Sequence, residues 1–240
     1  MSKSLQIPAL APLVAARLSG AGGQGLILMG KLLAEAAALH EGLNVVQTKS
    51  YGPEARGGAC RSDVIISPGE IDDLAGLPLD ILVCLSQASC DRFFGELAPQ
   101  GLLLVDSTQV TVVPTSRAVE LPLTATAASA CGSKMVANVV ALGALSGYCQ
   151  VVKFESLVAA VKATVRPAYH ELNLKALQAG YDLAQAHQRA RPRGFVVHEW
   201  DFSYLREQPA AKPRPARIRA KAKAKVKAAP TAAAARRRAS

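Results

Sequence analysis

Six residues, Gly20-Ala21-Gly22-Gly23-Gln24-Gly25, constrain the fold more than any other part of the chain. The mostly apolar residues 13–18 before them predict a short buried strand, and the Ala- and Leu-rich run at 23–40 after them predicts a helix that stops at Gly42. A strand, a glycine turn and a helix in this order are typical of the first half of a βαβ unit. The sequence therefore predicts an α/β fold.

The rest of the body continues this alternation. Runs such as residues 80–85 and 101–106 are apolar almost throughout, as a parallel sheet covered on both faces requires. We predict a single doubly wound, mostly parallel sheet domain over residues 13–190. The further elements expected in it are strands at 43–48, 60–67, 81–85 and 102–106, and helices at 91–98, 129–146, 154–165 and 167–187.

Charge is concentrated at the C-terminal end of the chain. Residues 205–240 hold twelve Lys or Arg and one acid, so of the net charge of +10 the preceding 204 residues carry about −1. The body therefore lacks the basic surface that nucleic-acid binding needs. We expect an extended arm at 191–208, either a strap across its own domain or a segment that docks elsewhere. A disordered Ala/Lys/Arg/Pro tail at 209–240 should follow, more often a solubilising extension than a binder of nucleic acid or acidic protein.

The five cysteines are spread along the body without a C-x-x-C pair. This spacing is typical of reduced packing residues in a cytosolic protein and argues against a zinc site or an iron–sulfur cluster held by this chain. No run of eighteen apolar residues is present, so we expect no membrane span and a cytoplasmic location.

The spacing Gly20-x-Gly22-x-x-Gly25 matches the dinucleotide-binding fingerprint in the strand-to-helix context that the motif needs. Free N–H groups at the start of the helix would favour an anion. A dinucleotide site also needs an acid about twenty residues on, at the end of the second strand, to bind the ribose. That strand ends in Val45-Val46-Gln47-Thr48, which contains no acid. A free-standing nucleotide-binding dehydrogenase is therefore an alternative and not the first choice.

A second segment, Ser50-Tyr51-Gly52-Pro53-Glu54-Ala55-Arg56-Gly57-Gly58, joins a carboxylate, a guanidinium and a phenol in one glycine-rich loop. The planar fork of Arg56 suits a carboxylate or a phosphate. A purely structural alternative is a rigid turn in which Glu54 and Arg56 satisfy each other. We expect this segment to lie close enough to the first one to share a site.

These two segments, with Ala137-Asn138-Val139-Val140-Ala141-Leu142-Gly143 and the later Asn173-Leu174-Lys175-Ala176, resemble the gamma subunit of 2-oxoacid:ferredoxin oxidoreductases of the pyruvate, ketoisovalerate and 2-oxoglutarate type. The resemblance runs from about residue 17 to about residue 186. The form Pro-Glu-Ala-Arg-Gly-Gly at 53–58 favours the 2-oxoglutarate enzymes.

The resemblance implies a subunit of a CoA-acylating oxidative decarboxylase. Alpha and beta subunits would hold thiamine diphosphate, magnesium and iron–sulfur clusters, ferredoxin would take the electrons, and CoA would be the co-substrate. No catalytic residue and no metal ligand is expected in this chain, which should be inactive alone. The residues expected to contact CoA, another anion or a partner subunit are Gly22, Gly23, Gln24, Gly25, Tyr51, Glu54, Arg56 and Gly57, with Arg56 ranked first.

Overall fold

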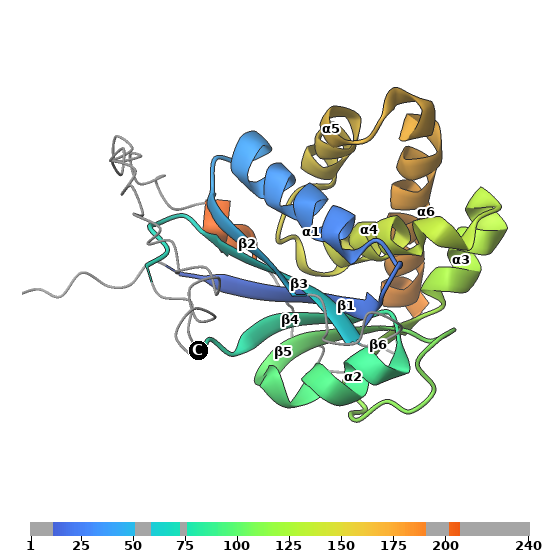
Figure 1. Cartoon of the computed structure of the whole chain (residues 1–240), viewed down its shortest axis with the longest axis horizontal. Helices are drawn as coiled ribbons and strands as arrows, with labels where there is room; N and C mark the ends of the chain where they lie inside the picture. The colour runs from blue at the N-terminus through green and yellow to red at the C-terminus, as the bar shows by residue number, and fades with distance from the viewer. Residues whose placement is uncertain (1–11, 51–58, 73–75, 191–201, 207–240) are drawn as a thin grey trace, which may run out of the picture.

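The computed structural model describes residues 12–50, 59–72, 76–190 and 202–206 (Figure 1). Within them, a six-stranded sheet is built from β1 (Val14–Ala21), β2 (Asn44–Ser50), β3 (Ala59–Ser67), β4 (Leu79–Cys84), β5 (Leu97–Asp106) and β6 (Val119–Leu121). The helices are α1 (Leu26–Glu35), α2 (Gln87–Phe93), α3 (Leu123–Cys131), α4 (Ala137–Cys149), α5 (Phe154–Thr164) and α6 (His170–Ala190).

The strand order is β2-β3-β1-β4-β5-β6. β1, β4, β5 and β6 pair in parallel, whereas β3 pairs antiparallel with both β1 and β2. Five strands thus point one way and β3 points the other, which confirms the predicted α/β class and makes the sheet mixed but mostly parallel. The apolar runs in β4 and β5 are explained by burial on both faces of the sheet.

The two faces of the sheet carry separate cores. Helices α1, α4, α5 and α6 lie on one face and α2 lies on the other (Figure 1). Neighbouring side chains of β1 accordingly alternate, with Leu18 in the large core and Ala15 in the smaller one. None of the helices in the described ranges is both long and apolar enough to cross a bilayer.

The predicted helix at 129–146 is two helices. α3 ends at Gly132, whose φ of 68° is left-handed, and Ser133 begins the next turn by accepting a hydrogen bond from the Met135 N–H. The expected helix at 91–98 begins earlier, as α2 at Gln87, and Leu97 already starts β5. The short strand β6 was not predicted, because three residues give no usable alternation.

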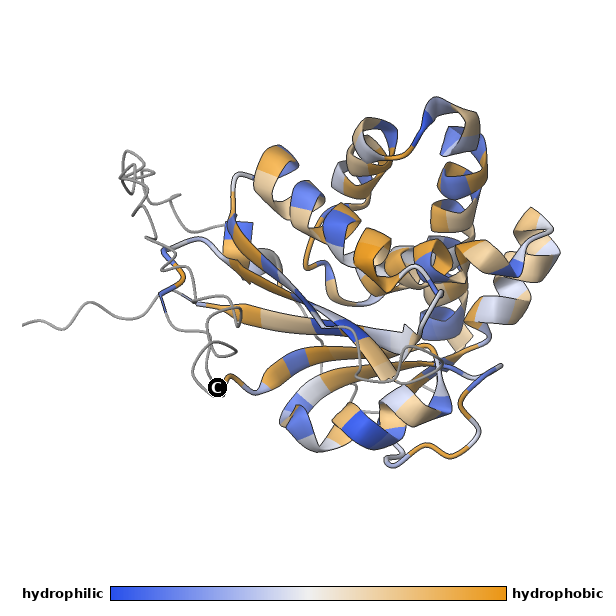
Figure 2. Ribbon diagram, in the orientation of Figure 1, coloured by the Kyte–Doolittle hydropathy of each residue, from blue (hydrophilic) through white to orange (hydrophobic). Residues whose placement is uncertain are grey.

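α4 is buried along its whole length, packs against α6 and shares the large core with the strands. Figure 2 shows hydrophobic residues dominating α4 and alternating with hydrophilic ones along α6. Two glycines of α4, Gly143 and Gly147, face α6. A Cβ on Gly143 would lie 2.0 Å from the Leu177 carbonyl oxygen, and one on Gly180 of α6 would lie 1.9 Å from the Val140 oxygen. Glycine therefore sets the approach of these helices.

Residues 202–206 pack on the same domain. The Phe202 N–H donates to the Cys149 carbonyl (3.1 Å), and Leu205 is completely buried in the large core. Arg206 forms an ion pair with Glu41 (3.3 Å). This part of the predicted arm is therefore a strap on its own domain; the rest of the arm, 191–201 and 207–208, and the tail at 209–240 lie outside the described residues.

Candidate functional site: the carboxyl edge of the sheet

The strand ends that flank both glycine segments lie at one edge of the sheet. β1 ends there at Ala21, which pairs with Ala59 at the start of β3, and Ser50 at the end of β2 pairs with Arg61. The two described ends of the second segment therefore lie at the same edge as the first. The predicted site residues Tyr51, Glu54, Arg56 and Gly57 themselves lie outside the described residues.

The first glycine segment is a turn braced by Gln24. The Gln24 side-chain oxygen accepts from the Ala21 N–H (2.6 Å), and its amide nitrogen donates to the Leu85 carbonyl just after β4 (2.9 Å). A Cβ at Gly20 would lie 2.3 Å from the Gln24 oxygen, so only glycine admits this brace. The Gln24 amide was expected to face a ligand or a partner; in the structure its oxygen and nitrogen both bind the protein, and it shapes the turn.

Gly25 begins α1 in a left-handed conformation, with φ of 72°. Its carbonyl accepts from the Met29 N–H (3.0 Å) and from the side-chain amide of Asn138 (3.0 Å), which is 4% exposed. A Cβ on Gly25 would lie 2.5 Å from that amide nitrogen. The third glycine of the motif thus admits a side chain from α4. The close approach of helix and strand occurs instead at Gly30, where a Cβ would lie 2.2 Å from the Ser62 hydroxyl.

A hollow of about 290 Å³ lies beside this turn. Its floor is the start of α1, where the first-turn N–H groups have no partner inside the helix and none of the first-turn residues is acidic. Such a floor accepts a phosphate or carboxylate. The lining residues come from the first segment, from α1 and from both sides of the second segment: Ala21, Gly22, Gly23, Gln24, Gly25, Leu26, Ile27, Ser50, Cys60 and Arg61.

The topology explains the missing ribose acid. In a dinucleotide-binding domain the second strand lies next to the first and brings its acid to the ribose. Here the antiparallel β3 lies between β1 and β2. Gln47 of β2 donates to the Ser62 hydroxyl of β3 (2.9 Å) and is held within the domain. The glycine motif is present without the strand arrangement that a dinucleotide site needs.

An ion cluster centred on the buried Arg17 links β1 to β3. Arg17 is 5% exposed and donates to both oxygens of Asp63 (2.8 and 3.1 Å) and to Glu96 (2.6 Å), with its guanidinium 4.9 Å from the centre of the Phe93 ring. Burial lowers the pKa of the Arg17 guanidinium, but the hydrogen bonds to Asp63 and Glu96 together with the negative charges of these acids raise it, and the net shift is upward. The cluster is internally balanced and is structural.

Metal ligands do not gather in the described ranges. No group of three or more His, Cys, Asp or Glu is placed to hold a metal ion in that part of the chain. Cys84 and Cys90 are both buried. The pKa of the Cys84 thiol is raised, mainly by its hydrogen bond with Cys90 and to a lesser extent by its burial. A thiol with a raised pKa is a poor metal ligand and nucleophile, which fits a packing role.

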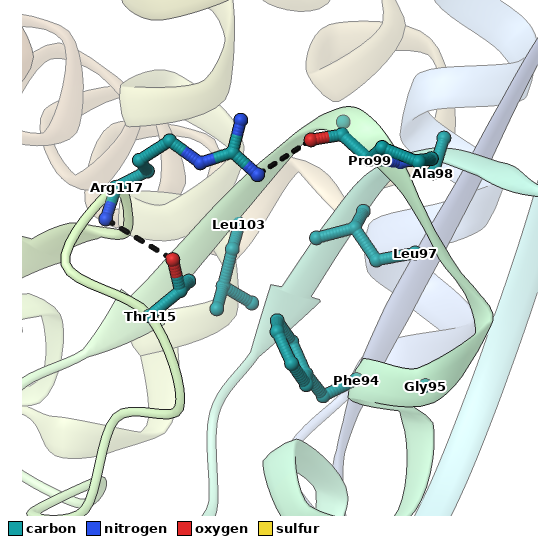
Figure 3. A pocket seen from close by; sticks show the side chains of 9 residues that line it. Phe94, Gly95, Leu97, Ala98, Pro99, Leu103, Thr115 and Arg117 are labelled. Atoms are coloured by element: carbon teal, nitrogen blue, oxygen red, sulfur yellow. Dashed lines mark hydrogen bonds between the residues drawn. The ribbon is translucent and has the colours of Figure 1, made fainter.

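A further hollow of about 210 Å³ lies on the face of α2, at the opposite edge of the sheet (Figure 3). Arg117 borders it, but its guanidinium donates to the Pro99 carbonyl and to the Gln100 side chain (3.2 Å). Because that cation is occupied and the hollow lies far along the strands from the glycine turn, it takes no part in the site.

The sequence did not predict the residues from distant parts of the chain that hydrogen-bond to the glycine turn. Asn138 lies 113 positions after Gly25 and Leu85 lies 61 after Gln24. The signal for Asn138 was a polar residue inside an otherwise apolar helix, which predicts a specific partner.

Comparisons with known proteins agree with this fold. The sequence profile of the family described as "Pyruvate ferredoxin/flavodoxin oxidoreductase" matches residues 15–183. 2-Oxoglutarate synthase subunit KorC of Methanocaldococcus jannaschii is 42% identical over 176 residues, which cover 70% of this chain and 92% of that protein.

Solved structures of oxoacid:ferredoxin oxidoreductases are also similar to this chain. The gamma subunit of a keto/oxoacid ferredoxin oxidoreductase from Geobacter sulfurreducens is 44% identical, with a TM-score of 0.68 over 73% of this chain and 98% of that one. The 2-oxoglutarate:ferredoxin oxidoreductase from Magnetococcus marinus, solved with 2-oxoglutarate, coenzyme A and succinyl-CoA, is 26% identical with a TM-score of 0.64. The similarity covers 75% of this chain and 32% of that longer one.

Proposed function

Because the chain belongs to the pyruvate ferredoxin/flavodoxin oxidoreductase family, as the gamma subunit of a multisubunit 2-oxoacid:ferredoxin oxidoreductase, we propose that its complex acts on 2-oxoglutarate. The observation that carries the proposal is the 42% identity to a 2-oxoglutarate synthase subunit over 92% of its length. The products would be succinyl-CoA, carbon dioxide and reduced ferredoxin.

In this proposal alpha and beta subunits hold thiamine diphosphate, magnesium and the iron–sulfur clusters. Thiamine diphosphate supplies the carbanion chemistry of the decarboxylation when bound. The described residues of this chain offer no cluster of metal ligands, and three of the five cysteines, Cys84, Cys90 and Cys149, are buried. The complex would work in the cytoplasm, and the isolated chain would be inactive.

The contribution of this chain is an anion-binding edge that faces CoA or a partner subunit. Gly22, Gly23 and Gly25 line the hollow at the start of α1, where helix N–H groups favour negative charge. The second segment enters and leaves at Ser50 and Ala59 at that edge. We propose Arg56 as the side chain that reaches the anion, with Tyr51, Glu54 and Gly57 positioning it.

Substrate choice is tested by purifying the complex from its native host through a tag on this chain. Proteins with thiamine diphosphate and iron–sulfur clusters should come with it, and the complex should reduce ferredoxin with 2-oxoglutarate and CoA. Pyruvate and branched-chain 2-oxo acids are the comparison substrates. A preference for one of them, or NAD(P)H formation by the isolated chain, would refute the proposal.

Arg56→Ala tests the role of the second segment. Losing one charge-assisted contact to an anion should lower CoA affinity by about tenfold or more while the complex still assembles. Arg56→Lys, which keeps the charge but not the fork, should recover part of it. Unchanged kinetics in an intact complex would exclude the contact with CoA, and loss of assembly would show that the segment binds a partner subunit.

A tail-driven role in nucleic-acid binding remains a separate proposal for residues 209–240. The salt dependence of DNA binding, measured with and without these residues, decides it, because each neutralised phosphate adds to the slope.

A further inference from the structure

The strap at 202–206 belongs to a part of the chain that the family match, residues 15–183, does not reach. The hydrogen bond from the Phe202 N–H to the Cys149 carbonyl and the complete burial of Leu205 make it a built part of the domain. Figure 1 shows the strap, in orange-red, at the end of the sheet away from the arrowhead of β1. The residues after Arg206 therefore start at the edge opposite the glycine turn.

All of the net charge of this protein lies beyond the strap. The tail at 209–240 holds eleven Lys or Arg and no acid, and Glu207 is the one acid between it and the strap. Residues 207–240 therefore carry the whole net charge of +10, and residues 1–206 carry none. This charge belongs to the sequence of residues 207–240, which lie outside the described part of the chain.

The acids that face the strap already have partners. The Glu41 carboxylate accepts from the Lys153 N–H (2.5 Å) and pairs with Arg206 (3.3 Å). Asp80, whose charge acts on the Tyr204 hydroxyl, accepts from a backbone N–H of β1 (2.8 Å). With the body neutral, an excess of ten positive charges remains that no acid of this chain balances.

This excess charge suits a negatively charged protein better than a nucleic acid. A tail that binds nucleic acid is normally helped by a basic surface on the folded body or by aromatic residues that stack on bases. Here the body has no net charge, and residues 207–240 contain no aromatic residue. A small electron carrier meets the requirement, because a cluster held by four thiolates is negative in both oxidation states.

We propose that the tail attracts the ferredoxin that accepts electrons from the complex and so raises the rate at which the two meet. This role rests on the proposed function, which supplies ferredoxin as the electron acceptor. The 34 residues after Arg206 reach at most roughly 120 Å from the strap, far enough to meet a carrier beside a partner subunit. Electrostatic steering of this kind raises association rates by about 10- to 1000-fold.

The test compares complexes reconstituted with the full chain and with a chain that ends at residue 208, which keeps the strap. At an ionic strength of about 0.01 M, where charges act over about 30 Å, kcat/KM for ferredoxin should fall about tenfold when the tail is removed. At about 0.5 M, where they act over about 4 Å, the two complexes should agree. The KM values for 2-oxoglutarate and CoA should stay the same, because the tail starts at the edge opposite the site.

Two full-length variants serve as controls for chain length. Lys221→Gln, Lys223→Gln, Lys225→Gln and Lys227→Gln combined should lower kcat/KM for ferredoxin about two- to fivefold at low ionic strength. The same four positions changed to Arg keep the charge and should keep the rate. Reduction of methyl viologen, a small dication that a positive tail does not attract, should be equally fast in all of these complexes.

Equal kcat/KM for ferredoxin with and without the tail at low ionic strength would overturn the inference. So would a matching loss of methyl viologen reduction, which would mean that the tail supports the complex itself. Tighter binding of a DNA duplex of about 30 base pairs than of ferredoxin, at about 0.15 M salt, would assign the tail to nucleic acid instead. A full-length complex that reduces methyl viologen with 2-oxoglutarate and CoA but does not reduce ferredoxin would refute the proposed function itself.

Discussion

Asp80, at the start of β4, shows how a single residue limits stability. Its carboxylate accepts from the Ala15 N–H (2.8 Å), yet burial dominates and raises its pKa above the ordinary value. A carboxyl group with a raised pKa in the folded state contributes stability that is fully present below its unfolded pKa and is lost as the pH rises through the folded pKa.

Asp80→Asn should therefore stabilise the protein at pH 7, because the amide oxygen can still accept from Ala15 and no charge is buried. The gain should shrink as the pH falls through the raised pKa of the wild-type carboxyl, because the protonated group no longer buries a charge. Urea unfolding of both proteins at pH 4, 5.5 and 7 measures it. A gain that is the same at all three values would show that the charge is not its cause.

At the scale of elements, the contact of α4 with α6 depends on glycine. Gly180→Ala places a Cβ 1.9 Å from a backbone oxygen of α4, which cannot move without displacing the helix. Overpacking of this kind costs about 1–3 kcal/mol, and we expect a loss at the upper end. Gly95→Ala is the matched control, because nothing lies within 4 Å of its Cβ, and should stay within about 0.5 kcal/mol. Equal effects of the two substitutions on chemical unfolding would contradict this.

The elements also show what a sequence can predict. β4 and the second half of β5 were predicted because strands buried on both faces are apolar almost throughout, and β1 was predicted from its place before the glycine turn. The reversed direction of β3 was not predicted, since strand direction depends on tertiary pairing and not on composition. The break at Gly132-Ser133 was readable as a C-cap followed by an N-cap, but the Ala-rich flanks masked it.

The site divides in the same way. The glycine turn was predicted from its spacing, because the requirement for glycine is local there. A Cβ on Gly20 would meet the Gln24 side chain, and Gly25 has a left-handed φ. Asn138 comes from the start of α4, which only the folded chain brings to the turn.

For the whole molecule, the strap at 202–206 joins the C-terminal part of the chain to the edge opposite the site. Glu41 is almost fully buried on its side chain (2% exposed), where it accepts from the Lys153 N–H (2.5 Å) and pairs with Arg206. Leu205 adds a completely buried side chain, worth about 1.5–3 kcal/mol. The strap therefore closes the large core and neutralises a buried carboxylate.

A chain that ends at residue 201 should be destabilised by about 3 kcal/mol or more relative to one that ends at 206, because it loses the burial of Leu205 and leaves Glu41 without its cation. Adding Glu41→Gln to the shorter chain should recover part of the loss by removing the unpaired charge. Urea unfolding of the three chains measures both effects. Equal stability of the chains ending at 201 and 206 would show that the strap is not part of the cooperative fold, whereas the expected difference extends the folding unit beyond α6 to Arg206.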